Sequence, residues 1–152
     1  MKKPFPVIVY SVLLLTGLFY GCNDHVGSTS PVLARIAKKF TVRLVEENNV
    51  IVYTKGAPNN IRPGYVQFLL DLSTPPGATL REFDANTFMA LKWIVLNDNR
   101  LILQGLTPQP SGTNGTVEFT INSLTDTELV ITRVSASDKT GGLIVKYTLT
   151  TQ

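Results

Sequence analysis

Cysteine and histidine each occur only once in the 152 residues, at Cys22 and His25 near the N-terminus. A single cysteine excludes an internal disulfide bond. The part of the chain that we expect to fold contains neither residue. This excludes a Ser-His-Asp triad, a cysteine nucleophile, a His-ligated zinc ion and conventional haem ligation there. We therefore expect no metal site, no cofactor and no enzyme activity.

Charged residues are also scarce, at 16% of the chain, against a usual share of about 25%. The formal net charge of +3 includes Lys2 and Lys3, which belong to an N-terminal signal. Without them, 12 basic and 11 acidic residues remain. A domain so close to neutral lacks the electrostatic footprint of a nucleic-acid-binding protein, so we expect no nucleic-acid partner.

The N-terminus has the pattern of an export signal. Lys2 and Lys3 precede an uncharged apolar run over residues 5–20. As a helix this run would be about 24 Å long, which is short for a hydrocarbon core of about 30 Å. We expect a cleaved signal peptide over residues 1–22, a polar tether over 23–30 and the folded domain over 31–152. An uncleaved membrane helix is one alternative.

The signal ends in a segment that resembles the lipobox of bacterial lipoproteins, Leu18-Phe19-Tyr20-Gly21-Cys22. The resemblance implies that the Cys22 thiol carries a diacylglycerol, and two or more acyl chains anchor a protein stably. We therefore expect a lipid-anchored protein of the cell envelope, at the outer membrane, on a membrane face that the sequence leaves open. The alternative is an ordinary secretory signal with an incidental cysteine.

The rest of the chain predicts an all-β domain after a short helix over residues 31–38, where Pro31 suits a first helical position. Short alternating runs then predict strands. They lie at 40–44, 50–54, 65–72, 80–84, 87–95, 101–103, 117–122, 129–133 and 143–149. Asn48-Asn49 and Asn97-Asp98-Asn99 predict tight turns. Residues 55–64 and 106–115 are the long loops. Short connections favour an up-and-down antiparallel barrel of about eight strands, with a two-sheet sandwich as the alternative.

Two segments resemble the bacterial lipocalin-like lipoprotein domains. Residues 92–103 carry a tryptophan, a strand, a polar turn and Leu-x-Leu, and residues 119–131 place Leu124-Thr125-Asp126 between two strands. The resemblance runs from about residue 36 to residue 150. It implies a small membrane-tethered barrel, usually without known activity, and it transfers no set of ligand residues.

Six residues are candidates for contact with a small hydrophobic ligand inside such a barrel. They are Phe68, Leu70, Leu91, Trp93, Phe119 and Arg133. We expect Trp93 to share an inner strand face with Met89, Leu91 and Val95, which also suits a plain core residue.

Charged residues on three of the predicted strands require a separate interpretation. Arg133 shares a strand face with Leu129 and Ile131. It would either point into the barrel and pair with a carboxylate or a ligand headgroup, or lie in solvent at a strand end, which we favour. Glu82 and Asp84 stand two residues apart, and we expect them to be solvated on an edge strand. Glu47 is expected at a strand end beside a turn.

These observations lead to three functional hypotheses. The first is a non-enzymatic domain that binds a small hydrophobic ligand inside the barrel. The second is a barrel filled by its own side chains, which an eight-stranded barrel allows, acting on an unknown protein partner through the loops 55–64 and 106–115. The third, an enzyme, would require a cavity on which Glu82, Asp84 or Arg133 converge.

Overall fold

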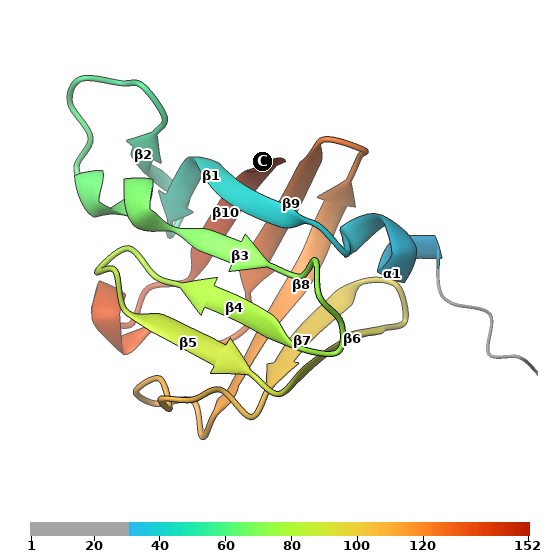
Figure 1. Cartoon of the computed structure of the whole chain (residues 1–152). Helices are drawn as coiled ribbons and strands as arrows, with labels where there is room; N and C mark the ends of the chain where they lie inside the picture. Colours follow the sequence, from blue (N-terminus) through green and yellow to red (C-terminus); the bar gives the residue numbers. More distant parts are fainter. Residues whose placement is uncertain (1–30) are drawn as a thin grey trace, which may run out of the picture.

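The structure, a computed structural model, describes residues 31–152 and is an all-β fold with one small helix (Figure 1). The expected signal peptide, Cys22 and tether lie outside the described residues. The helix α1 spans Pro31–Ile36, as predicted within two residues. The strands are β1 (Lys39–Glu47), β2 (Val50–Thr54), β3 (Leu69–Asp71), β4 (Ala78–Arg81), β5 (Thr87–Ala90), β6 (Lys92–Leu96), β7 (Arg100–Gln104), β8 (Thr116–Leu124), β9 (Glu128–Arg133) and β10 (Val145–Thr151).

All ten strands belong to one antiparallel sheet, in the order β5-β4-β3-β1-β10-β9-β8-β7-β6, with β2 paired to β1. β2 and β3 share one side of β1, because β2 pairs with Leu44–Glu47 and β3 with Lys39–Thr41. β5 and β6 follow one another along a single line, separated by Leu91 alone. The strands therefore occupy eight positions in an up-and-down arrangement, as the sequence predicted.

Two backbone hydrogen bonds bring the ends of this sheet together. The amide of Met89 donates to Thr107 O (2.8 Å), and the amide of Thr107 donates back to Met89 O (2.9 Å). Because β5 is thereby joined to the continuation of β7, the sheet nearly closes into a barrel. The prediction of an up-and-down barrel is confirmed, and one continuous sheet replaces the alternative of two packed sheets.

The predicted inner face of Met89, Leu91, Trp93 and Val95 is only partly correct: Trp93 is buried and Val95 packs against the core, whereas Met89 and Leu91 are exposed. The register against β7 is continuous, because Met89 faces Thr107 and Lys92 faces Gln104. Phe88 and Ala90 nevertheless point inward, and the next residue to do so is Trp93, so the alternation of inward and outward side chains is interrupted between them. Leu91 is 78% exposed. The backbone of Gly105 opposite has a φ of +67°, and a Cβ there would lie 2.8 Å from Leu91 Cδ1. Leu91 therefore covers a glycine on the outside of the barrel.

The predicted strand over residues 65–72 is only partly correct. The 3-10 helix η1 (Pro63–Gln67) occupies its first half, and β3 begins at Leu69. Tyr65 consequently points inward and is fully buried, whereas Val66 is exposed. Proline at the start of η1 suits the helical turn, since its φ is already fixed near the helical value.

The tight turns agree with the prediction. Asn48, Asn49, Asn97 and Asp98 all have positive φ, between 46° and 67°, as a two-residue hairpin turn with the right twist requires. Each turn sets the register of the hairpin it closes. No helix in residues 31–152 is long and apolar enough to cross a membrane.

Side chains fill the interior of the barrel. The largest fully buried ones are Ile36, Phe40, Tyr65, Phe68, Leu70, Leu72, Leu80, Leu101, Leu103, Phe119, Leu129 and Ile131. Phe68 stacks on Tyr147 with ring centroids 4.4 Å apart, and Phe119 meets the same tyrosine edge-on at 6.3 Å. The aromatic rings thus pack across the barrel and form one continuous core.

Candidate functional site

The barrel has two ends of different construction. We call the loop end the one formed by residues 48–67, which include β2 and η1, and by residues 82–88, 105–115 and 134–144. These segments touch, since a Cβ at Gly64 would lie 2.6 Å from Phe83 O and one at Gly112 would lie 2.6 Å from Asp138 Oδ2. We call the helix end the one formed by α1, the turn at Pro75-Pro76 and the turns at 97–99 and 125–127. Figure 1 shows α1 on the side opposite the loop at 134–144.

Four charged side chains converge at the loop end, and we call them the Glu82 cluster: Glu82, Asp84, Arg133 and Lys139. Arg133 Nη1 donates to Glu82 Oε1 at 3.1 Å, and Lys139 Nζ lies 2.7 Å from Glu82 Oε2 and 2.8 Å from Asp84 Oδ2. Arg133 and Glu82 are buried. Two positive and two negative groups leave the cluster neutral, which a buried site requires.

The favoured prediction of a solvated Arg133 is therefore wrong, and the alternative of an inward arginine paired with a carboxylate is correct. The strand does not end or bulge before Arg133, because this residue still pairs with Phe119 of β8. The expected solvated edge for Glu82 is also wrong. The turn after β4, closed by the amide of Glu82 on Asn86 O at 3.0 Å, directs the Glu82 carboxylate into the barrel. Asp84 remains partly exposed.

A second buried carboxylate, Glu47, lies at the same end of the barrel. The hydroxyl of Tyr65 donates to Glu47 Oε1 at 2.7 Å, and Arg62 Nε donates to Oε2 at 2.9 Å. Arg62 also lies over the ring of Phe83, 5.7 Å from its centroid. We call Glu47, Arg62 and Tyr65 the Glu47 cluster; it too is neutral.

The prediction of Glu47 as a strand end beside a turn described its place in the chain but missed its burial. A register irregularity in β1 between Val42 and Leu44 changes which residues point inward. Val45 and Glu47 consequently face the interior after Phe40 and Val42. The sequence carries no clear signal for this irregularity, so the side of the sheet on which Glu47 lies was not predictable.

Four groups at or near the loop end, Tyr65, Asp84, Lys139 and Tyr147, have shifted pKa values. Burial raises the pKa of the Tyr65 hydroxyl, and Tyr147 and the hydrogen bond to Glu47 raise it further. Burial likewise raises the pKa of Tyr147. Burial opposes the charged forms of Asp84 and Lys139. The ion pair with Lys139 and hydrogen bonds from Asn86 outweigh burial at Asp84, and the ion pairs with Asp84 and Glu82 outweigh it at Lys139. The pKa of Asp84 is therefore lowered and that of Lys139 is raised.

This arrangement is suited to sealing the barrel. Each carboxylate of the two clusters has a cationic partner, so none stands as an unpaired acid or base. A hollow of about 230 Å³ beside Phe88 and Lys139 opens on the surface, and neither Glu82 nor Arg133 lines it. Among residues 31–152 no group of three or more His, Cys, Asp or Glu side chains could hold a metal ion.

The candidate ligand residues separate into three places. Phe68, Leu70, Phe119 and Arg133 are buried in the interior, and none of them lines any of the four hollows that we describe. Trp93 is buried at the helix end, where it lines a hollow. Leu91 lies on the outer surface, apart from the other five.

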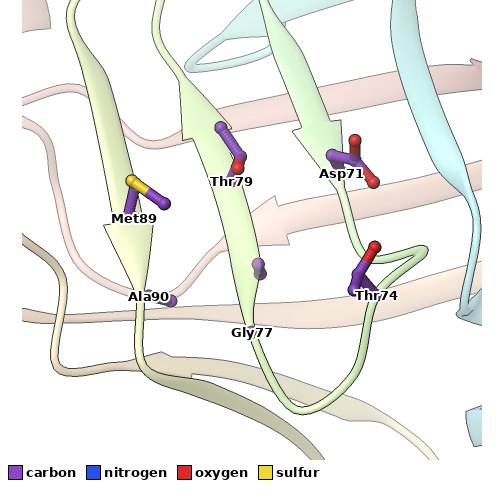
Figure 2. Close-up of a pocket in the computed structure, with 7 residues that line it drawn as sticks. Asp71, Thr74, Gly77, Thr79, Met89 and Ala90 are labelled. Atoms are coloured by element: carbon purple, nitrogen blue, oxygen red, sulfur yellow. The ribbon is translucent and has the colours of Figure 1, made fainter.

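Two of the surface hollows show the range of their chemistry. A hollow of about 220 Å³ lies on the outside of β3, β4 and β5. Figure 2 shows three of its lining residues, Asp71, Thr79 and Met89, on these neighbouring strands. Asp71 is already engaged, because its Oδ1 accepts hydrogen bonds from the amide and the hydroxyl of Ser73. The hollow at the helix end is larger, about 400 Å³, and is lined by Leu33, Ala34, Ala37, Pro75, Pro76 and Trp93.

Two solved structures, both of Bacteroides proteins, are similar to this chain. One is a lipocalin-like protein from Bacteroides uniformis, 13% identical, with 78% of this chain and 99% of that one covered and a TM-score of 0.45. The other is an uncharacterized protein from Bacteroides eggerthii, 12% identical, with 76% and 98% covered and the same TM-score. No model of a protein family and no curated protein matches the chain. Identities this low concern the fold alone.

Proposed function

We propose that this protein is a lipid-anchored accessory domain of the bacterial cell envelope that binds a protein partner through its loop end. The observation that carries the proposal is the filled interior. Aromatic side chains occupy the barrel, and the Glu82 and Glu47 clusters close its loop end. A ligand inside the barrel would have to displace packed rings or separate buried ion pairs, which is costly. The geometry therefore favours a protein-binding module over a carrier.

The anchor in this proposal is the lipid on Cys22, which the lipobox resemblance implies. Outer-membrane placement follows from the same resemblance and is part of the proposal. An anchored domain needs no membrane-spanning segment of its own, since two or more acyl chains hold it stably.

The partner surface that we propose runs from the start of β2 to the end of η1, residues 50–67. The loop 55–62 projects from the barrel at the upper left of Figure 1, away from α1. Four of the ten large apolar side chains that residues 31–152 expose fall in this stretch: Val50, Ile51, Ile61 and Val66. Apolar side chains gathered beside a projecting loop are typical of protein-binding sites.

The test is a comparison of protein complexes extracted from membranes in mild detergent. We expect the parent protein to elute with a protein partner and the double variant Ile61→Asp, Val66→Asp to elute alone. Both residues are more than 60% exposed, so their replacement leaves the core intact. Leu96→Asp, at an exposed position of β6, is the matched control and should still elute with the partner. A parent that elutes alone with a non-covalently bound lipid, lost in Phe119→Trp, would instead indicate a carrier.

A further inference from the structure

The hollow at the helix end differs from the rest of the surface in its chemistry. Its six lining residues, Leu33, Ala34, Ala37, Pro75, Pro76 and Trp93, carry no charged side chain. Its volume of about 400 Å³ falls in the range of small-molecule sites. Trp93 is only 4% exposed, and its Nε1–H has no hydrogen-bond partner among the described residues. Exposing such an apolar surface to water costs free energy.

A cationic side chain stands beside this hollow. A second hollow of about 350 Å³ shares Pro76 with it and is lined also by Leu91, Lys92, Gln104 and Gly105. Lys92 is exposed and directly precedes Trp93 in β6. The helix end thus combines an apolar recess with a lysine in the adjoining hollow, the two features that the acyl chain and the phosphate of a phospholipid require.

The position of Cys22 in the chain brings this hollow near a membrane. Eight residues separate Cys22 from Pro31, the first residue of α1. The nine Cα–Cα steps from Cys22 to Pro31 span at most about 32 Å even when fully extended. A lipid on Cys22 would therefore keep α1 within that distance of the bilayer surface, and α1 with the residue that follows it supplies three of the six residues that line the hollow, Leu33, Ala34 and Ala37.

We propose that the hollow binds an acyl chain of a bilayer phospholipid, with the phosphate at Lys92, so that the helix end of the barrel sits on the membrane. The loop end then faces away from the bilayer, where a protein partner has access to it. This inference rests on the lipid anchor of the proposed function. It deepens that function by giving the anchored domain a fixed orientation.

Trp93 is the only tryptophan in the chain, and its fluorescence therefore reports on this hollow alone. The mature protein, purified from membranes, is placed in phosphatidylcholine–phosphatidylglycerol vesicles with brominated or unmodified acyl chains. Bromine quenches indole fluorescence on contact. We expect Trp93 to lose most of its fluorescence in the brominated vesicles, and unchanged fluorescence would overturn the proposal. If the lipid on Cys22 itself filled the hollow, the fluorescence would also be unchanged in brominated vesicles.

Two variants test whether the quenching arises in the hollow. Ala34→Glu places a carboxylate at an exposed lining residue, and we expect it to restore the fluorescence. Val66→Glu places the same charge at an exposed residue of the loop end and should quench like the parent. Equal quenching in both variants would overturn the proposal.

The mass of the same samples tests the anchor separately. A Cys22 lipid without quenching would leave the anchor standing and reject the docked orientation. Quenching without a Cys22 lipid would reject the anchor and support the lipid-binding hollow on its own.

Discussion

The two ends of the barrel handle charge in opposite ways. At the loop end, Glu82 and Arg133 are both buried and form an ion pair of 3.1 Å. At the helix end, Arg35 and Asp126 form a longer pair of 3.5 Å, and their side chains are 46% and 89% exposed. A guanidinium–carboxylate pair therefore closes the interior at the loop end and lies on the exposed surface at the helix end.

This difference has an energetic meaning. A buried charge loses its hydration and depends on its partner, whereas an exposed charge returns to water when its partner is removed. The loop end should accordingly be sensitive to loss of a single charge, and the helix end should tolerate it. An interior closed by coupled charges is a rigid base on which projecting loops can be presented to a partner.

The largest expected effect is that of Glu82→Ala. The substitution leaves Arg133 buried without its carboxylate, and breaking a buried pair in this way costs about 3–5 kcal/mol. Lys139 retains Asp84 as a partner, so Arg133 is the group left uncompensated. Urea unfolding monitored by Trp93 fluorescence would measure the loss in the free energy of unfolding.

The double variant Glu82→Met, Arg133→Met is the control for this interpretation. It removes both charges and leaves apolar side chains of similar length, which is often nearly neutral in stability. We expect the double variant to recover most of the free energy of unfolding that Glu82→Ala loses. A double variant as unstable as the single one would mean that shape and packing, and not charge pairing, hold the loop end together.

A smaller and pH-dependent effect is expected of Asp84→Asn. The Lys139 ion pair lowers the pKa of Asp84 in the folded protein, so this carboxylate contributes stability above its unfolded pKa, near 3.9. The contribution is lost as the pH falls through the lowered folded pKa. The parent should therefore be more stable than Asp84→Asn at pH 7, and the two should converge on acidification. Thermal unfolding of the parent and of Asp84→Asn at pH 7 and at pH 3 would measure the difference in their stability. A difference that is larger at pH 3 than at pH 7 would contradict this role of the Asp84 carboxylate.

Much of the fold follows from local pattern. Alternating apolar residues located the strands, and Asn48 and Asn49 located a turn because their side chains tolerate positive φ. Pro31 located the start of the helix. These features depend on a few neighbouring residues, and for that reason a single sequence reveals them.

The errors at Glu47 and at Leu91 share one cause, a change in which residues face inward along a strand. The irregularity after Val42 turns Glu47 inward, and the distortion at Gly105 turns Leu91 outward. A shift of one residue moves every later side chain to the other face. Neither distortion has a clear signature in the sequence, so the Glu47 cluster was missed.

The Glu82 cluster was only partly predictable. Arg133 stood where the alternation called for an apolar residue, and that misplaced charge was the signal for an inward arginine. Its partner Glu82 lies 51 residues away in the chain. Only the closure of the barrel brings β4 and β9 close enough for the pair, and closure depends on the whole sheet.

The smallest effect is expected at the helix end, from Asp126→Ala. Lys38 Nζ donates to the backbone oxygen of Asp126, and Arg35 Nη2 donates to Leu124 O. Both hydrogen bonds survive the substitution, so only the exposed ion pair is removed, for which about 0–1 kcal/mol is usual. Urea unfolding should barely distinguish this variant from the parent, and less still at high salt, which screens exposed charges. A loss as large as that of Glu82→Ala would mean that the helix end depends on its ion pair as the loop end does, and the contrast between the two ends would fail.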